Sequence, residues 1–133
     1  MNGPRREVPF GRLRPPQYTL TEPDPFWRFD GPAEAALTLV LAHGAGAPMD
    51  SPFMNEIALG VGARGIRVAR FELPYMAARR ATGARRPPDS EPVLRRAWIA
   101  AVASLGGGGR LVVGGKSLGG RIASMVADEV AAR

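Results

Sequence analysis

The chain has 133 residues, of which 45% are hydrophobic and 23% are charged. These values are typical of one globular domain and exclude a wholly disordered chain. Cysteine is absent, which excludes disulfides, cysteine-ligated zinc and thiol catalysis. Lysine and arginine together number 18 against 12 acidic residues, a formal net charge of +6.

The longest nearly apolar run, residues 35–42, is far shorter than the roughly 18 residues that span a bilayer. The N-terminus continues into proline and arginine and has no apolar segment of a secretory signal. We therefore expect a cytoplasmic protein without a membrane contact. Residues 1–25 are predicted to be a loose Pro/Arg-rich arm, and residues 26–133 to form the domain.

The domain begins with a short predicted edge strand, in which Trp27 and Phe29 alternate with charged residues. Residues 37–42 are continuously apolar and stop at glycines, which is typical of a strand buried on both faces. A helix is predicted to start at Ser51, followed by proline at its first position. Its buried face is expected to carry the residues spaced four apart, Phe53, Ile57 and Val61.

Residues 66–71 form the next predicted strand, and Pro74 is expected to end its hydrogen-bond ladder. Residues 77–92 are predicted to be a basic, proline-containing loop. A helix then runs from about Glu91 to Leu105, and its Trp98 belongs to the core.

Residues 111–113 are predicted to be a third buried strand, and a helix runs on from Gly119 with Ile122, Val126 and Val130 on one face. Strands and helices therefore alternate, with crossovers long enough for parallel pairing. The pattern predicts an α/β fold, a parallel sheet with helices on both faces.

The segment from Gly115 to Gly119 matches the pattern G-x-S-x-G between the third strand and the last helix. Such a turn holds Ser117 in a strained conformation with its hydroxyl exposed, and side chains at positions 115 and 119 would collide across it. We expect Ser117 to be a nucleophile and the Leu118 N–H to be one oxyanion donor. The loop after the first buried strand supplies the second donor, with the Ala45 N–H as first candidate and Gly46 next.

The glycine-containing segments do not match either of two phosphate-binding patterns. A P-loop ending at Gly115-Lys116-Ser117 would need glycine at position 110, which is Arg110. A dinucleotide-binding pattern starting at Gly44 would need glycine where Met49 stands. No cofactor and no metal is expected.

Three further residues lie at predicted strand ends and line the expected site. His43 is the only histidine, and it directly precedes residues 44–46, the glycine loop. This position indicates a side chain that hydrogen-bonds the backbone. As a general base it would violate the Ser, acid, His order of this fold. Glu72 is expected to be a solvated strand-end carboxylate, with orientation of a substrate or of an arginine as the alternative. Lys116 is expected to be exposed, or else to pair with Glu72.

Four arginines form a dense basic stretch before Pro87: Arg79, Arg80, Arg85 and Arg86. Attraction of an anionic substrate or of nucleic acid is one interpretation. We favour a solvated loop tied by Asp89 and Glu91, because no aromatic residues interleave as base stacking requires. Nucleic acid is therefore not expected as a partner.

Several segments together resemble a known family. They are residues 43–54, residues 70–76, the paired arginines with residues 85–89, and residues 114–121. Their order is similar to that in predicted bacterial α/β-hydrolases related to the hydrolase-like domain of NSL-complex subunit three, and more distantly to dienelactone hydrolases. The resemblance covers about residues 27–130. It implies a serine hydrolase acting on an ester-like or other small acyl substrate through Ser117.

The resemblance also implies further strand–helix units, which carry the acid and the histidine of the catalytic triad. No histidine follows Ser117 in this sequence. The expectation is therefore the N-terminal half of the domain, truncated at its C-terminal side. Residues 111–113 would then be an unpaired apolar edge open to self-association. The alternative function is a non-catalytic protein-interaction module with the same fold.

Overall fold

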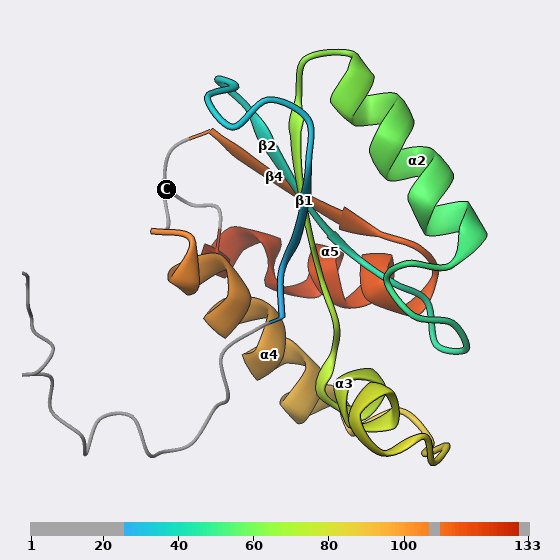
Figure 1. Ribbon diagram of the computed structural model, residues 1–133. Coiled ribbons are helices and arrows are strands. Elements are labelled where there is room, and N and C mark those ends of the chain that lie inside the picture. Colours follow the sequence, from blue (N-terminus) through green and yellow to red (C-terminus); the bar gives the residue numbers. More distant parts are fainter. Residues whose placement is uncertain (1–25, 107–109, 131–133) are drawn as a thin grey trace, which may run out of the picture.

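The computed structural model describes residues 26–106 and 110–130 and shows an α/β fold (Figure 1). Four strands form one sheet in the order β1-β3-β2-β4. The strands are β1 (Arg28–Asp30), β2 (Thr38–Ala42), β3 (Arg67–Phe71) and β4 (Leu111–Gly115). The helices are α2 (Pro52–Ala63), α3 (Pro74–Thr82), α4 (Glu91–Ser104) and α5 (Leu118–Val130).

The sheet is parallel except for β1, which pairs antiparallel with β3 as an edge strand. In register, Ala42 of β2 lies opposite Phe71 of β3 on one side and Gly115 of β4 on the other. The carboxyl ends of the three parallel strands therefore meet at one edge, where sites of open α/β sheets lie. This edge brings together the segments that follow Ala42, Phe71 and Gly115.

Helices cover both faces of the sheet, as the sequence predicts. α4 and α5 lie on one face, and α2 lies on the other (Figure 1). Trp98 of α4 is completely buried and meets the Phe71 ring edge-on, with 4.9 Å between ring centroids. Its indole N–H donates to the Gly119 carbonyl of α5 at 3.2 Å, so the largest core side chain also anchors the start of α5.

The predicted start of α2 is confirmed, but the predicted buried face is wrong by one residue. The Ser51 hydroxyl accepts the Met54 N–H at 3.3 Å, an N-cap followed by proline at the first position. The buried residues of α2 are Met54, Ala58 and Gly62. Phe53 is instead 48% exposed, and Ile57 is exposed as well.

The predicted loop over residues 77–92 is wrong in its first part, because residues 74–82 form α3. Pro74 begins this helix at its first turn, where the missing N–H costs no hydrogen bond. Gly83, with φ of 81°, ends it in the left-handed conformation that favours glycine.

Residues 111–113 do not form a buried strand, and the alternative expectation of an apolar edge fits the described residues. β4 is an edge strand of the described sheet, and Val112 is 46% exposed. The predicted arm over residues 1–25 lies outside the described residues.

Candidate active site

Ser117 lies in the turn between β4 and α5 with φ of 52°. It is the only residue other than glycine with a positive φ within the described ranges. For an L-residue this conformation costs about 1–2 kcal/mol. The Lys116 N–H, which donates to the Ala42 carbonyl at 3.1 Å, and the Gly119 N–H, which donates to the Lys116 carbonyl at 3.0 Å, hold the turn against this strain.

The glycines around this turn are required because the backbones approach each other closely. A Cβ at Gly115 would lie 2.7 Å from the Ala42 carbonyl oxygen and from the Gly119 carbonyl carbon. At Gly119 it would strike the carbonyl oxygen of His43. Gly120, which lies outside the G-x-S-x-G pattern, faces the Gly115 carbonyl with as little space. The geometry is that of a tight strand–turn–helix with an exposed serine at its apex.

Ser117 lines two clefts, one on each side. The larger, of about 680 Å³, lies against α4 and α5 and includes Ala45, Leu118 and Arg121 in its lining. The smaller, of about 390 Å³, lies between residues 44–47 and the start of α2. The structure thus brings Ser117 together with Leu118, Ala45 and Gly46, and their role as oxyanion donors stays a prediction.

His43 is completely buried and both of its ring nitrogens have backbone partners. Nε2 accepts the Leu73 N–H at 3.0 Å, so the ring proton belongs on Nδ1, which donates to the Gly44 carbonyl at 2.6 Å. Burial lowers the pKa of His43 below its usual value, an effect that the hydrogen bond to Gly44 partly opposes. A neutral imidazole with both nitrogens engaged cannot take the proton of Ser117.

Tyr75 is a site residue that the sequence analysis missed. It is almost fully buried, and its hydroxyl lies 2.9 Å from the Ala45 carbonyl oxygen, to which it donates. Its backbone N–H donates to the Asp89 carboxylate at 2.8 Å. Burial, with a smaller contribution from Asp89, raises the pKa of Tyr75 to about 12, so the hydroxyl keeps its proton at neutral pH.

Tyr75 and His43 together orient the two candidates for the second oxyanion donor, the N–H groups of Ala45 and Gly46. In a planar trans peptide the carbonyl and the following N–H point in opposite directions. The Gly44 carbonyl held by His43 therefore sets the direction of the Ala45 N–H. The Ala45 carbonyl held by Tyr75 likewise sets the direction of the Gly46 N–H. A tyrosine four residues beyond the end of a buried strand, in the first turn of α3, is the signal that would have revealed this contact.

Two predictions for Glu72 are wrong: its carboxylate is not solvated, and it does not pair with Lys116. Its side chain is fully buried, and Arg80 forms a two-pronged contact with it, Nε to Oε1 at 2.8 Å and Nη2 to Oε2 at 2.7 Å. Arg80 also reaches Asp50 at 2.7 Å. Its hydrogen bonds to Glu72 and Asp50 raise the pKa of Arg80, and the same contact lowers the pKa of Asp50.

Both backbone polar groups of Met49, which lies just beyond the glycine loop, have charged side-chain partners. Its N–H donates to Glu72 Oε2 at 3.1 Å, and its carbonyl accepts from buried Arg70 at 2.8 Å. Arg70 is itself paired with Asp30 at 3.0 Å. These charged groups fix the loop between β2 and α2, which gives Glu72 and Arg70 a role in supporting the site.

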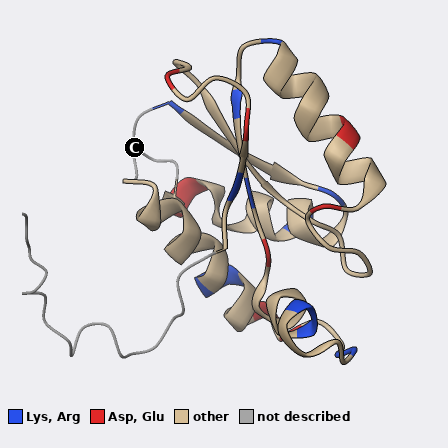
Figure 2. Ribbon diagram, viewed as in Figure 1, with Lys and Arg blue, Asp and Glu red and all other residues tan. Residues whose placement is uncertain are grey.

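The basic stretch gathers at one end of the molecule, on α3 and the segment that follows it (Figure 2). As expected, Asp89 ties it down, through an ion pair with Arg86 at 3.4 Å. Glu91 does not take part, because it pairs with Arg95 of its own helix. Two of the arginines, Arg79 and Arg80, belong to α3 and not to a loop.

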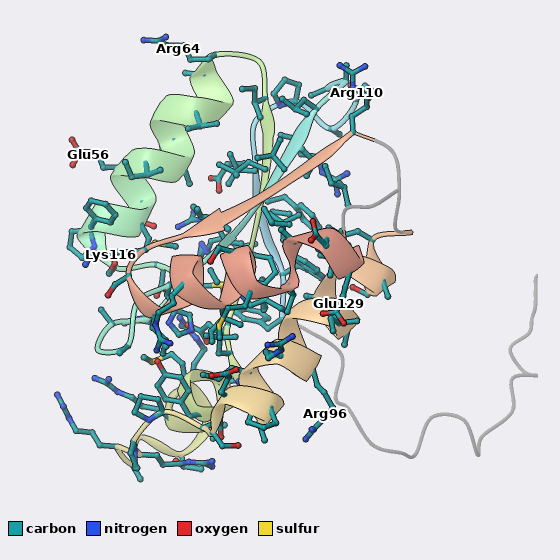
Figure 3. The ribbon with its side chains drawn as sticks, turned by 180° about the vertical axis from the view of Figure 1, so that it is seen from behind. Glu56, Arg64, Arg96, Arg110, Lys116 and Glu129 are labelled. Atoms are coloured by element: carbon teal, nitrogen blue, oxygen red, sulfur yellow. The ribbon has the colours of Figure 1, made fainter. Side chains whose placement is uncertain are left out.

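Lys116 is exposed, and its ammonium lies 5.3 Å from the centroid of the Phe53 ring. Figure 3, seen from behind, shows Lys116 beside the N-terminal end of α2.

Within the described residues, no group of three or more His, Asp or Glu side chains is placed to hold a metal ion. None of the helices in that part of the chain has both the length and the apolar character to cross a membrane.

Comparison with known proteins agrees with this geometry. A family model described as an alpha/beta hydrolase domain matches residues 35–133, which include the glycine loop, the Glu72 segment and the serine turn. No curated protein and no solved structure shows a significant match to the chain. Because the family model covers most of the sequence, the chain belongs to the alpha/beta hydrolase family.

Proposed function

We propose that this domain is a serine hydrolase, in which Ser117 attacks the carbonyl carbon of an ester-like or other acyl substrate. One observation carries the proposal: Ser117 alone among the described non-glycine residues has a positive φ, and it is exposed at a cleft. Strain of this kind persists only where surrounding contacts impose it, and it clusters at active sites.

In the proposed mechanism, the substrate carbonyl oxygen takes up negative charge as Ser117 Oγ bonds to the carbon. The Leu118 N–H at the start of α5 and the Ala45 or Gly46 N–H would stabilise that oxygen. One such donor lowers the barrier by about 3 kcal/mol. The N-terminal end of α5 adds a favourable dipole at the same position.

The proton of Ser117 needs an acceptor, which His43 cannot provide because both of its nitrogens are engaged. Asp89 and Glu91 line the same cleft as Ser117. The Asp89 carboxylate, however, binds the Tyr75 backbone N–H and Arg86, and that of Glu91 binds Arg95. Efficient turnover therefore requires a base from outside the described residues, 26–106 and 110–130. Without one, we expect slow acylation supported by the oxyanion donors alone.

The test compares covalent labelling by a fluorophosphonate probe and p-nitrophenyl ester cleavage in the wild type and in Ser117→Ala. We expect labelling and ester cleavage in the wild type and neither in the variant. Ser124→Ala is the matched control, because Ser124 lies on the exposed side of α5 and its hydroxyl donates to the Arg121 carbonyl. Equal signals from the wild type and Ser117→Ala would reject the proposal.

The second candidate is a non-catalytic interaction module with this fold. The full engagement of the only histidine favours it. A saturable protein partner in pull-downs, together with unlabelled Ser117, is the result expected from such a module. Labelling of Ser117 with burst kinetics would exclude it.

We also propose a finer placement within the family. The segments at residues 43–54, 70–76 and 114–121 support a relation to the hydrolase-like domain of NSL-complex subunit three, and more distantly to dienelactone hydrolases. A bacterial origin and a cytoplasmic location belong to the same proposal.

A further inference from the structure

The smaller cleft beside Ser117 contains a single charged side chain. Its lining is formed by residues 44–47, the N-cap Ser51 with the first turn of α2, Lys116 and Ser117. The first turn of α2 contributes Pro52, Phe53 and Met54, which are apolar. A group bound here would meet apolar walls, one cation and two serines, Ser117 and Ser51, whose hydroxyl already accepts the Met54 N–H.

The Lys116 side chain forms the outer wall of this cleft. A Cβ placed on Gly44 would lie 3.7 Å from both Cγ and Cδ of Lys116, so the lysine stem passes directly over the glycine loop. The ammonium then lies over the Phe53 ring of α2, 5.3 Å from the ring centroid. A cation held over an aromatic face keeps its charge available to an anion on its other side.

No carboxylate lies within ion-pair distance of Lys116 in the described part of the chain. Glu56, which Figure 3 labels on α2, does not line the cleft. This arrangement differs from that of the larger cleft, where Asp89 and Glu91 are present and already have arginine partners. The larger cleft also has a cation, Arg121, beside these two carboxylates, whereas Lys116 is the only charged residue that lines the smaller cleft.

We propose that this cleft binds the acyl part of the substrate and that Lys116 pairs with a carboxylate at the end of a short acyl chain. The substrate class is then a monoester of a short dicarboxylic acid. This inference rests on the proposed function of Ser117, but it makes a separate claim about which acyl groups are preferred. An exposed ion pair of this kind changes a rate by a few-fold, about three- to fivefold, and salt weakens it.

The experiment compares p-nitrophenol release from mono-p-nitrophenyl glutarate and from p-nitrophenyl valerate, which have acyl chains of equal carbon number. The ratio of the two rates is measured in the wild type, in Lys116→Gln and in Arg64→Gln. Arg64 is an exposed cation at the opposite end of α2 and serves as the charge-matched control. Both rates in a ratio come from the same protein, so a change in activity that affects both esters equally cancels.

We expect the glutarate-to-valerate ratio to fall about three- to fivefold in Lys116→Gln and to stay unchanged in Arg64→Gln. High salt should lower the wild-type ratio and leave that of Lys116→Gln unaffected. A ratio that is the same in Lys116→Gln and the wild type would overturn the proposal.

Failure of the proposed function gives a different result, namely no p-nitrophenol from either ester and no fluorophosphonate labelling. Binding then decides the inference. Monomethyl glutarate and methyl valerate are titrated into isotope-labelled wild type and Lys116→Gln while the amide resonances of residues 44–47 are followed. Shifts that need both the free carboxylate and Lys116 support the subsite, and their absence overturns it.

Discussion

Replacement of Tyr75 by phenylalanine tests whether the glycine loop is positioned by a single buried hydroxyl. The variant keeps the ring, including its edge contact with His43 at 5.9 Å, and removes the donor to the Ala45 carbonyl. A net hydrogen bond contributes about 1 kcal/mol, which corresponds to about a fivefold shift in an equilibrium between loop orientations. Complete loss of an oxyanion donor would cost about 3 kcal/mol, more than a hundredfold.

We therefore expect the maximal rate of fluorophosphonate labelling of Ser117 to fall about fivefold in Tyr75→Phe, with little change in the probe concentration for half-saturation. The smaller figure applies because His43 still holds the Gly44 carbonyl. The effect should be the same from neutral pH to pH 9, since the pKa of Tyr75 is raised to about 12 and the hydroxyl stays protonated.

The control for this experiment is Ser104→Ala at the C-terminal end of α4. Its hydroxyl accepts from Trp27 at 3.3 Å and donates to the Ala101 carbonyl at 2.8 Å, so a comparable loss of hydrogen bonding occurs away from the serine turn. Both variants should lose a similar amount of unfolding free energy in urea, and only Tyr75→Phe should slow labelling. Unchanged labelling in Tyr75→Phe, or equal slowing in both, would refute the reasoning.

Three further predictions concern stability. Burial lowers the pKa of His43, so as pH falls the unfolded chain takes up a proton on this histidine at a higher pH than the folded chain does. The free energy of unfolding should therefore fall as pH drops below 6.5. In the folded protein the single imidazole resonance, followed by NMR, should not titrate at that pH. Gly115→Ala should destabilise the fold by about 1–3 kcal/mol in urea unfolding, because its Cβ would lie 2.7 Å from the Ala42 carbonyl oxygen, whereas Gly46→Ala, with nothing within 4 Å, should be nearly neutral. Ser117→Gly should be more stable than Ser117→Ala by about 1 kcal/mol, because only glycine relieves the cost of a φ of 52°; equal stabilities would contradict the strain.

The serine turn could be predicted from sequence because its requirements are local. Two glycines flanking Ser117, an apolar strand before them and a periodic helix after them specify the turn without long-range information. The position of His43 next to a glycine loop likewise indicated a backbone-bonding role, and the structure places the ring in two backbone hydrogen bonds.

The buried face of α2 could not be predicted from hydrophobicity alone. The row that packs inward ends at Gly62, where a Cβ would lie 3.0 Å from the Gly31 nitrogen. The helix approaches the turn after β1 so closely that small residues are needed there. Hydrophobicity instead favours the row that contains Phe53 and Ile57, which the structure leaves exposed.

The environment of Glu72 depends on contacts that its own sequence neighbours do not reveal. Arg80 reaches it only because Pro74 starts α3, and the sequence analysis treated that proline as the end of a strand. The Met49 N–H comes to Glu72 from another part of the chain. Partners of this kind offset the cost of burying a carboxylate, and the sequence pattern alone does not reveal them.

The position of β4 at the edge of the described sheet has a thermodynamic consequence for Ser117. The outer side of β4 carries backbone donors and acceptors without a partner strand in the described residues, and the same strand ends at the serine turn. A strand that docks there would bind the element that leads into the Ser117 turn. By linkage, any effect of that docking on the affinity of Ser117 for a ligand equals the effect of the ligand on docking. If a strand that extends the sheet favours ligand binding at Ser117, a ligand bound there must favour docking of the strand to the same extent.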